Sequence, residues 1–439
     1  MKFTRRHFIK NLGLGAGACF IALNTLGCSS GSSGSDAGSL WEPGSTRDKI
    51  VVISDIHLGI DDRYTETKQN RSHLVNFLKS VRKTTDVREL VIAGDFLDEW
   101  YLPVYYPSHS DQDLFYRSVI ANNQNVFNEL NKVIASGIKL VYVPGNHDLT
   151  LESYILQEAI PGLVQARDVR GLGAYYTGDR NEIVIEHGHR YDIFSAPDTV
   201  TNAELCGNDD TILPAGYFYA RYAATWVLEG KPTVPKILPG VTNIPDMSDP
   251  DQYGAYLYHL TLKTVSERMT PYEAPEEKIF DMRISGFNDS YSYLDFYPAE
   301  LEDGTISAPV LFKNIQRTWA ERQTLNNVNV HSSFIEAVPA SVNSAAYFAQ
   351  AKVQYLENPS ENVDVVVFGH THVPSYRDAG GGKSYVNSGT WIDHNVDFQN
   401  IERTFAVITT GASSTSAVYS YLADGTAEDV TASLAATDD

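Results

Sequence analysis

The chain has 439 residues, of which 43% are hydrophobic, and its formal net charge is −21. This length exceeds what one compact domain usually needs. A surface this acidic repels DNA, RNA and anionic membranes at long range, which excludes an extended nucleic acid polymer as a favourable partner. A small phosphate ester is compatible with that charge, because a local pair of cations can attract it.

The N-terminal segment resembles a bacterial export signal. Arg5 and Arg6 form a twin-arginine pair, which Phe8 follows. An apolar, Gly/Ala-rich stretch over residues 12–26 is short for a membrane span and is interrupted by polar residues. It ends at Cys28, in a sequence that resembles a bacterial lipoprotein cleavage box.

This resemblance predicts a signal peptide over 1–27, an acylated Cys28 and a Gly/Ser-rich tether over 28–48. The protein is then exported to the cell envelope, in the periplasm or on the outer surface, and touches the membrane through its lipid anchor alone. A secretory signal cut elsewhere, or an uncleaved anchor, is the alternative. The other cysteines, Cys19 and Cys206, allow no disulfide framework in the mature chain, so Cys206 is expected to be a packed thiol.

Apolar runs rich in β-branched residues predict five buried strands. They span residues 50–53, 89–93, 140–143, 183–185 and 363–368. Amphipathic stretches over 72–83 and 114–136 predict helices between the first three runs, the second ending at Gly137. Alternating strands and helices indicate an α/β fold, in which ligands gather beyond the carboxyl ends of the strands.

The remaining apolar segments lie in the tail and in a long gap. Runs at 385–386, 405–408 and 417–421 predict further strands, which suggest a second, partly antiparallel sheet packed on the first. Residues from about 200 to 345 are rich in Tyr, Pro and Asn, and form far more than one strand–helix connection. We interpret them as an inserted, mainly helical cap beside the site.

A short block of potential metal ligands follows each predicted buried strand. The blocks are Asp55-Ile56-His57, Gly94-Asp95-Phe96-Leu97-Asp98, Gly145-Asn146-His147-Asp148, His187-Gly188-His189 and Gly369-His370-Thr371-His372. An aspartate can bridge two divalent ions, imidazoles suit zinc, iron and manganese, and an Asn carbonyl adds an oxygen without charge. Such a set can hold two dications, which together polarise a bridging water and clamp phosphoryl oxygens.

The order of these blocks resembles that of the calcineurin-like metallophosphoesterases, the superfamily of purple acid phosphatases and UDP-diacylglucosamine hydrolases. The resemblance covers roughly residues 49–195 and 350–395. It implies a four-layer α/β/β/α sandwich with two central mixed β-sheets, here with a large, mainly helical insertion. The domains expected are a first core part over 49–199, a cap over 200–345 and a second core part over 346–439.

The resemblance also implies roles for single residues. One metal ion would be held by Asp55, His57, Asp95 and His372, and a second by Asp95, Asn146, His187 and His370. His147 would give a proton or hydrogen bond to the leaving oxygen, oriented by Asp98. The ions would be Mn, Zn, Fe or similar.

Four residues near these blocks stay open to more than one interpretation. Both His187 and His189 could serve as the ligand of the fourth block, although His187 directly follows the predicted strand and matches the family better. His189, Arg190 and Asp148 are candidates to orient a ligand or to contact substrate phosphate. Arg190 is as compatible with a solvated or salt-bridged side chain.

The function expected is that of a dinuclear-metal-dependent phosphoesterase, in which a metal-bridging hydroxide attacks phosphorus. Its substrate would be a small phosphate ester or pyrophosphate, such as a nucleotide, a sugar phosphate or a lipid headgroup. Aromatic clusters at 217–219, 253–258 and 291–297 can stack on a base or sugar, but more often form a core. The alternative is a weakly active or inactive metal-binding envelope protein that acts through its cap, with a protein partner that the sequence does not identify.

Overall fold

The computed structural model describes residues 37–106, 111–207, 211–230, 238–269, 275–307, 309–393 and 401–435. The predicted signal peptide, Cys28 and the first part of the predicted tether lie outside the described residues. Among the helices that are described, none combines the length and apolar character needed to cross a bilayer. The chain contacts divide into two compact units, and we describe each unit by itself.

The first unit comprises residues 37–98, Asp113–Gly188 and 351–435, and we call it the sandwich unit. Its larger sheet has seven strands, of which the first four below are parallel and the others antiparallel. They are β1 (Lys49–Ile53), β2 (Val87–Ala93), β3 (Lys139–Val143), β4 (Val164–Gln165), β12 (Thr404–Thr409), β13 (Thr415–Tyr421) and β14 (Ala427–Asp429).

The smaller sheet of the sandwich unit has five strands in the order β10-β11-β9-β6-β5. They are β5 (Ala174–Thr177), β6 (Ile183–Glu186), β9 (Val365–Phe368), β10 (Ser375–Gly380) and β11 (Lys383–Asn387). Strand β9 pairs in parallel with β6 and β11, and the two edge pairs are antiparallel. Both sheets are therefore mixed, as the predicted fold class requires.

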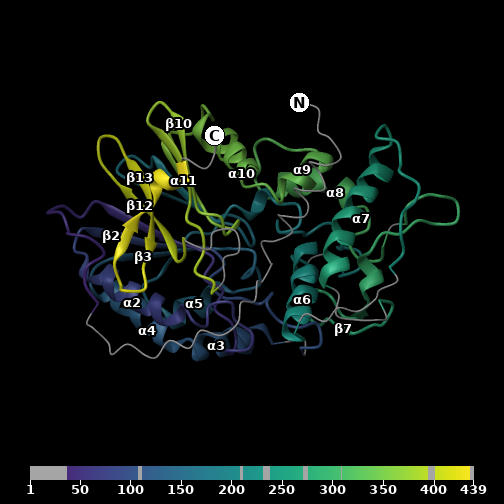
Figure 1. The fold of residues 1–439 in the computed structure, drawn as a ribbon, viewed down its shortest axis with the longest axis horizontal. Coiled ribbons are helices and arrows are strands. Elements are labelled where there is room, and N and C mark those ends of the chain that lie inside the picture. Colours follow the sequence, from purple (N-terminus) through teal and green to yellow (C-terminus); the bar gives the residue numbers. More distant parts are fainter. Residues whose placement is uncertain are drawn as a thin grey trace. The chain divides into compact units, whose positions relative to one another are not determined.

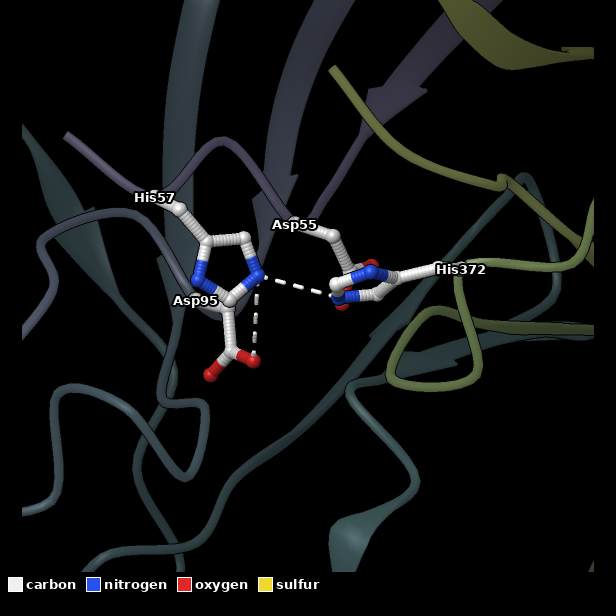
Figure 2. Close-up of side chains that lie close together, drawn as sticks. All are labelled: Asp55, His57, Asp95 and His372. Atoms are coloured by element: carbon white, nitrogen blue, oxygen red, sulfur yellow. Dashed lines mark hydrogen bonds and ion pairs between the residues drawn. The ribbon is translucent and has the colours of Figure 1, made fainter. Parts of the chain in front are cut away.

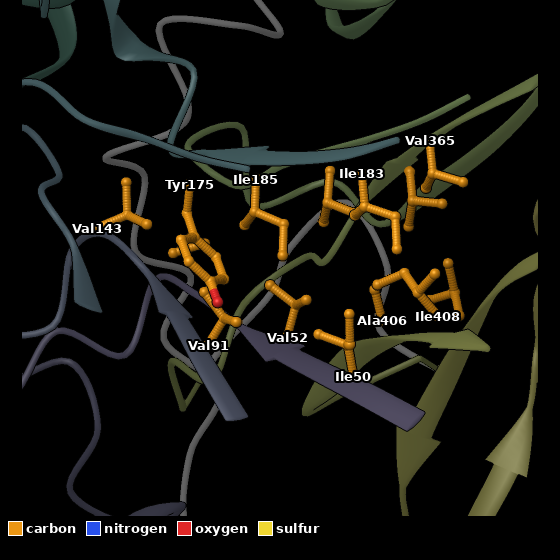
Figure 3. Close-up of a cluster of buried hydrophobic side chains, with 14 of the residues drawn as sticks. Ile50, Val52, Val91, Val143, Tyr175, Ile183, Ile185, Val365, Ala406 and Ile408 are labelled. Atoms are coloured by element: carbon orange, nitrogen blue, oxygen red, sulfur yellow. The ribbon is translucent and has the colours of Figure 1, made fainter. Parts of the chain in front are cut away.

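An apolar core lies between the two sheets (Figure 3). Alternate residues of the central strands face it, such as Ile50 and Val52 from β1 and Ile183 and Ile185 from β6, and all four are fully buried. Their neighbours Val51 and Ile53 are also buried, on the other face of the larger sheet. Burial on both faces explains why these strands are apolar throughout, and each such side chain contributes about 1.5–3 kcal/mol.

Helices cover the larger sheet on its outer face (Figure 1). They include α2 (Arg71–Lys83), α3 (Gln112–Asn122), α4 (Gln124–Ala135) and α5 (Ser153–Ala159), while α11 (Thr431–Ala435) contacts β10 and β13. Phe77 of α2 packs on the rings of Phe405 and Tyr421, with centroids 4.9 and 5.4 Å away. The π-helical turn η3 (Lys352–Leu356) contacts β9 of the smaller sheet.

Two sequence-based expectations about local structure were wrong. The helix expected over 114–136 is two helices, because the backbone leaves helical geometry at Asn123, whose side-chain amide donates to the carbonyl of Gly59. The tail strands do not form the second sheet together: β12 pairs antiparallel with β1 in the larger sheet, β13 pairs antiparallel with β12, and of the predicted tail strands only β11 joins the smaller sheet. A short apolar run does not specify its partner strand, so the sequence could not predict which strands pair.

The second unit comprises Glu99–Gln112 and His189–Gln350, and we call it the helical unit. Its helices are η1 (His189–Tyr191), α6 (Ala215–Leu228), α7 (Pro250–Met269), η2 (Tyr293–Phe296), α8 (Ile315–Leu325), α9 (Phe334–Ala340) and α10 (Ser344–Ala351). A two-stranded sheet of β7 (Phe280–Asp281) and β8 (Ser290–Tyr291) completes it. This mainly helical part, together with the two mixed sheets, confirms the predicted fold class.

The aromatic residues of the helical unit form its core. Phe218 is fully buried, and its ring contacts those of Phe280, Phe287, Phe296 and Phe312, with centroids 5.4–6.0 Å away. Two buried arginines in this unit donate hydrogen bonds to backbone carbonyls. The guanidinium of Arg221 donates to the carbonyls of Leu102 and Pro103, and that of Arg322 donates to the carbonyls of Ile193 and Ala196. The packing interpretation of the aromatic runs thus agrees with the structure.

Candidate metal centre

All five blocks begin at the carboxyl ends of strands in the sandwich unit. Strands β1, β2 and β3 are parallel neighbours, so the segments that follow them start at one edge of the larger sheet. Strands β6 and β9 are parallel neighbours in the smaller sheet. Backbone hydrogen bonds join the blocks, including those from Asp55 N–H to the Gly94 carbonyl and from Gly369 N–H to the His187 carbonyl.

A first group contains Asp55, His57, Asp95 and His372 (Figure 2), and one potential ligand atom from each lies within 4.8 Å of the others. The Nε2 atoms of His57 and His372 face each other at 3.0 Å. His372 Nε2 is 3.3 Å from Asp55 Oδ1, and His57 Nε2 is 3.7 Å from Asp95 Oδ2. None of the four side chains is more than 9% exposed, so water solvates this group poorly.

A second group contains Asp95, His187 and His370, with the amide oxygen of Asn146 among them. His187 Nε2 lies 3.2 Å from Asp95 Oδ2 and 3.1 Å from Asn146 Oδ1, and His370 Nδ1 lies 2.9 Å from the same amide oxygen. His187 Nδ1 faces the carbonyl oxygen of Ala93 at 2.8 Å, so it carries the proton and leaves Nε2 as a lone-pair donor. Asp95 belongs to both groups.

A third group places His147 beside Asp98 and His57. The Nδ1 atoms of His147 and His57 lie 2.9 Å from Asp98 Oδ1 and Oδ2 respectively, so one carboxylate serves two imidazoles. The two rings meet edge to face, with centroids 4.5 Å apart. Burial acts to raise the pKa of Asp98, but the two imidazoles outweigh it and hold that pKa well below its usual range.

The donor atoms of the first two groups fit divalent cations. Two imidazole nitrogens that face each other at 3.0 Å repel unless a proton or a cation lies between them. Burial acts to lower the pKa of His187, but the carboxylates of Asp95 and Asp55 raise it to about 9, so this cluster attracts positive charge. Imidazole nitrogen with carboxylate and amide oxygen suits zinc, iron and manganese.

The backbone at five of these residues adopts an uncommon conformation. Asp55, His57, Asp95, His370 and His372 have φ between 49° and 71°, in the left-handed region. Such a conformation costs on the order of 1–3 kcal/mol per residue and persists where the surrounding structure enforces it, often at functional sites. The strands and their cross-links thus hold the candidate ligands in positions that a free loop would not adopt.

The glycine of the second block is required by the ligand of the fourth. Gly94 has φ +87°, and a Cβ atom there would lie 2.5 Å from Cγ and Nδ1 of His187. Gly369 is similar, since a Cβ atom would lie 2.6 Å from Asp55 Oδ2. These glycines therefore make room for a ligand from another block, which explains their place in the pattern.

Replacing Gly94 with alanine is expected to displace the His187 ring. We expect the bound metal to fall from two ions to about one, with a loss of activity of about 10²-fold, measured by elemental analysis and steady-state kinetics. Gly380→Ala is the matched control, because Gly380 has a similar φ of +80° but no atom within 4 Å of the added Cβ. Equal metal content in Gly94→Ala and the control would contradict this reasoning.

The structure separates the residues that the sequence left open. His187 belongs to the second group, whereas His189 is in none of the groups found among the described residues. His189 and Arg190 are buried in η1 of the helical unit, and the Arg190 guanidinium donates to the carbonyl of Asn326. Asp148 is buried in the sandwich unit, where its carboxylate accepts from Phe96 N–H and Gly145 N–H and so connects the second and third blocks.

Sequence reasoning missed several residues that support the site. Thr390 donates to the carbonyl of Asp55, and Asn387 donates to that of Gly369. The hydroxyls of Ser54 and Ser388 lie 2.7 Å apart. Three of these residues lie at the end of β11 or directly after it, in the run Asn387-Ser388-Gly389-Thr390, whose turn-forming polar residues were the available signal.

Two stacked mixed sheets with a buried set of carboxylates and imidazoles at their strand ends define a metal-dependent phosphoesterase. Residues 48–229 match the family model described as Calcineurin-like phosphoesterase. The matched residues contain the first four blocks. The place of His370 and His372 beside them comes from the structure.

Comparison with solved structures gives two further findings. A crystal structure of a dimetal phosphatase from Danio rerio has 11% sequence identity and a TM-score of 0.36, with 88% of this chain and 99% of that chain covered. The phosphopantetheinyl hydrolase from Mycobacterium tuberculosis has 12% identity and a TM-score of 0.25, with 78% and 89% covered. Neither similarity bears on the activity of this chain. No curated protein matches it.

Proposed function

We propose that this protein hydrolyses a small phosphate ester or pyrophosphate with the help of two divalent cations. The observation that carries the proposal is the place of Asp95 in two separate groups of potential ligands, one with Asp55, His57 and His372 and one with His187 and His370. A carboxylate can serve two cations at once, and Asp95 Oδ2 faces both groups, at 3.7 Å from His57 Nε2 and 3.2 Å from His187 Nε2.

The ligands of one cation would be Asp55, His57, Asp95 and His372, as above. The ligands of the second cation would be Asp95, Asn146, His187 and His370. When bound, two such cations draw charge from the phosphoryl group and activate the attacking water. The protein side chains keep this region dry and fix the direction of each ligand atom, which strengthens every charge interaction there.

His147 is proposed as the proton donor to the leaving oxygen. Its Nδ1 lies 2.9 Å from Asp98 Oδ1, and Nε2 is the nitrogen proposed to give the proton. The Asp98 carboxylate stays ionised because its pKa is lowered by the two imidazoles against the effect of burial, and its charge favours the protonated form of His147. The backbone N–H of His147 donates to Asp95 Oδ1 at 2.8 Å, which ties the donor to the bridging ligand.

A direct test combines elemental analysis with a substrate panel. Purified protein is expected to carry about two divalent ions per chain. It is then assayed with phosphomonoesters, diesters, nucleotides, sugar phosphates and pyrophosphates in the presence of Mn, Zn, Fe or Mg. Bound metal without hydrolysis of any substrate would refute the enzymatic proposal and favour the binding-protein alternative.

Metal removal is expected to destabilise the sandwich unit. A ligand present at 100 times its dissociation constant stabilises the folded state by about 2.7 kcal/mol, so chelation is expected to lower Tm by roughly 5–10 °C. Differential scanning calorimetry before and after dialysis against a chelator measures the shift. Addition of Mn or Zn should restore Tm, whereas an unchanged Tm would argue against a tight site.

We also propose that the protein acts in the bacterial cell envelope, anchored by a lipid on Cys28. The twin-arginine pair and the cleavage box described above support this proposal. Cys28→Ser is expected to abolish incorporation of radiolabelled fatty acid and to release the protein from the membrane fraction. Persistent labelling of the variant would refute the anchor without affecting the proposed chemistry.

A further inference from the structure

Besides Asp98, a second buried carboxylate lies near Nδ1 of His57, on the side of the ring away from the candidate metal site. Glu66 is 6% exposed, and its Oε2 is 3.6 Å from His57 Nδ1. It belongs to the segment after β1, outside all five blocks, and no motif marks it. The opposite ring nitrogen, Nε2, is the atom that joins the first group of candidate ligands.

The segment that carries Glu66 is fixed on both sides. The Thr65 hydroxyl donates to the carbonyl of His57 at 3.1 Å, and the Thr67 hydroxyl donates to the carbonyl of Ile56. The Glu66 carbonyl accepts from Asp393 N–H at 2.8 Å. The backbone around Glu66 is therefore attached to the first block itself, which keeps the carboxylate beside the His57 ring.

A second carboxylate is useful to His57 because Asp98 is shared between two histidines. This residue accepts from Nδ1 of both His57 and His147, one per oxygen. A protonated His147 polarises the Asp98 carboxylate toward itself, which weakens the hydrogen bond that Asp98 accepts from the Nδ1–H of His57. At 3.6 Å Glu66 is too far for a direct hydrogen bond, but in a dry site its charge still favours a proton on Nδ1.

We propose that Glu66 is a positioning residue that keeps the His57 proton on Nδ1, so that Nε2 remains a metal ligand while Asp98 serves His147. This inference rests on the proposed dimetal function. In metal sites, partners of the ligating histidines fix the tautomer and the ring direction, and their loss commonly costs 10–100-fold in metal affinity. Here two carboxylates from different segments share that task.

Zn²⁺ affinity of the metal-free protein, measured by competition with a fluorescent chelator, tests the proposal. Glu66→Gln keeps the shape of the side chain but removes its charge, and we expect the weaker of the two Zn²⁺ dissociation constants to rise about 10-fold. Glu66→Asp restores the charge and should recover part of the affinity. Glu129→Gln is the matched control, since Glu129 is also a buried acid, with ion-pair partners Arg82 on α2 and Lys132 on α4.

A double-mutant cycle separates this role from a purely structural one. If both carboxylates act on one N–H, Glu66→Gln should weaken Zn²⁺ binding more in an Asp98→Asn background than alone. Strictly additive losses, or an unchanged affinity with only a lower Tm, would overturn the inference. Failure of the parent protein to bind Zn²⁺ would instead refute the proposed function, and this inference with it.

Discussion

Asp95→Asn is expected to lower kcat/KM by about 10³-fold or more, which corresponds to ~4 kcal/mol of transition-state stabilisation. Asp95 is the residue common to both groups of candidate ligands. The oxygen of Asp95 that faces both groups is Oδ2, and a neutral amide in place of the charged carboxylate bridges two cations far more weakly. The bound metal is therefore expected to fall from two ions toward one, as measured by elemental analysis of the purified variant.

The size of this effect depends on the burial of Asp95. The side chain is 1% exposed, so water cannot compensate for the lost charge without a rearrangement of the surrounding blocks. Asp86→Asn is a suitable control, because Asp86 is also buried but accepts from Trp41 and Gly44 instead. A variant at Asp95 that kept two ions and full turnover would exclude the bridging role.

The parts of the fold that were predictable are those in which a local pattern decides the structure. Runs such as 50–53 and 140–143 are rich in β-branched residues and apolar on both faces, which is typical of a buried strand, and they lie in β1 and β3. The ligand blocks were predictable because each follows such a strand. Their convergence was expected from the common direction of parallel strands rather than from the blocks themselves.

The parts that were not predictable depend on tertiary contacts between segments that are far apart in the sequence. Glu66 comes within 3.6 Å of His57 although nothing in its own neighbourhood distinguishes it from a surface acid. Segment Glu99–Gln112 joins the helical unit through contacts such as that of Leu102 with Arg221, nearly 120 residues later in the chain. Likewise the sequence favoured His187 over His189 without excluding His189, and the bond from His187 to the Ala93 carbonyl shows how His187 is held.

Replacement of His147 by glutamine is expected to have an effect that depends on the leaving group. General acid catalysis contributes about 10²–10⁴-fold, and it matters most where the departing oxygen is strongly basic. An alkyl phosphate should therefore lose activity by about this factor, while a nitrophenyl ester, whose leaving group departs without a proton, should lose far less. The measurement is kcat for a series of esters with leaving groups of increasing pKa.

The slope of log kcat against leaving-group pKa shows whether His147 donates a proton. In the parent protein a proton from His147 offsets the growing charge on the leaving oxygen, so log kcat should depend weakly on the leaving-group pKa; in His147→Gln the slope should steepen. Metal content should be unchanged, because His147 contacts Asp98 and is absent from the two groups that share Asp95. His259→Gln, at a buried histidine of the helical unit bound to the Pro298 carbonyl, controls for the loss of a buried imidazole. An equal loss across all esters would mean that His147 positions the phosphoryl group and gives no proton.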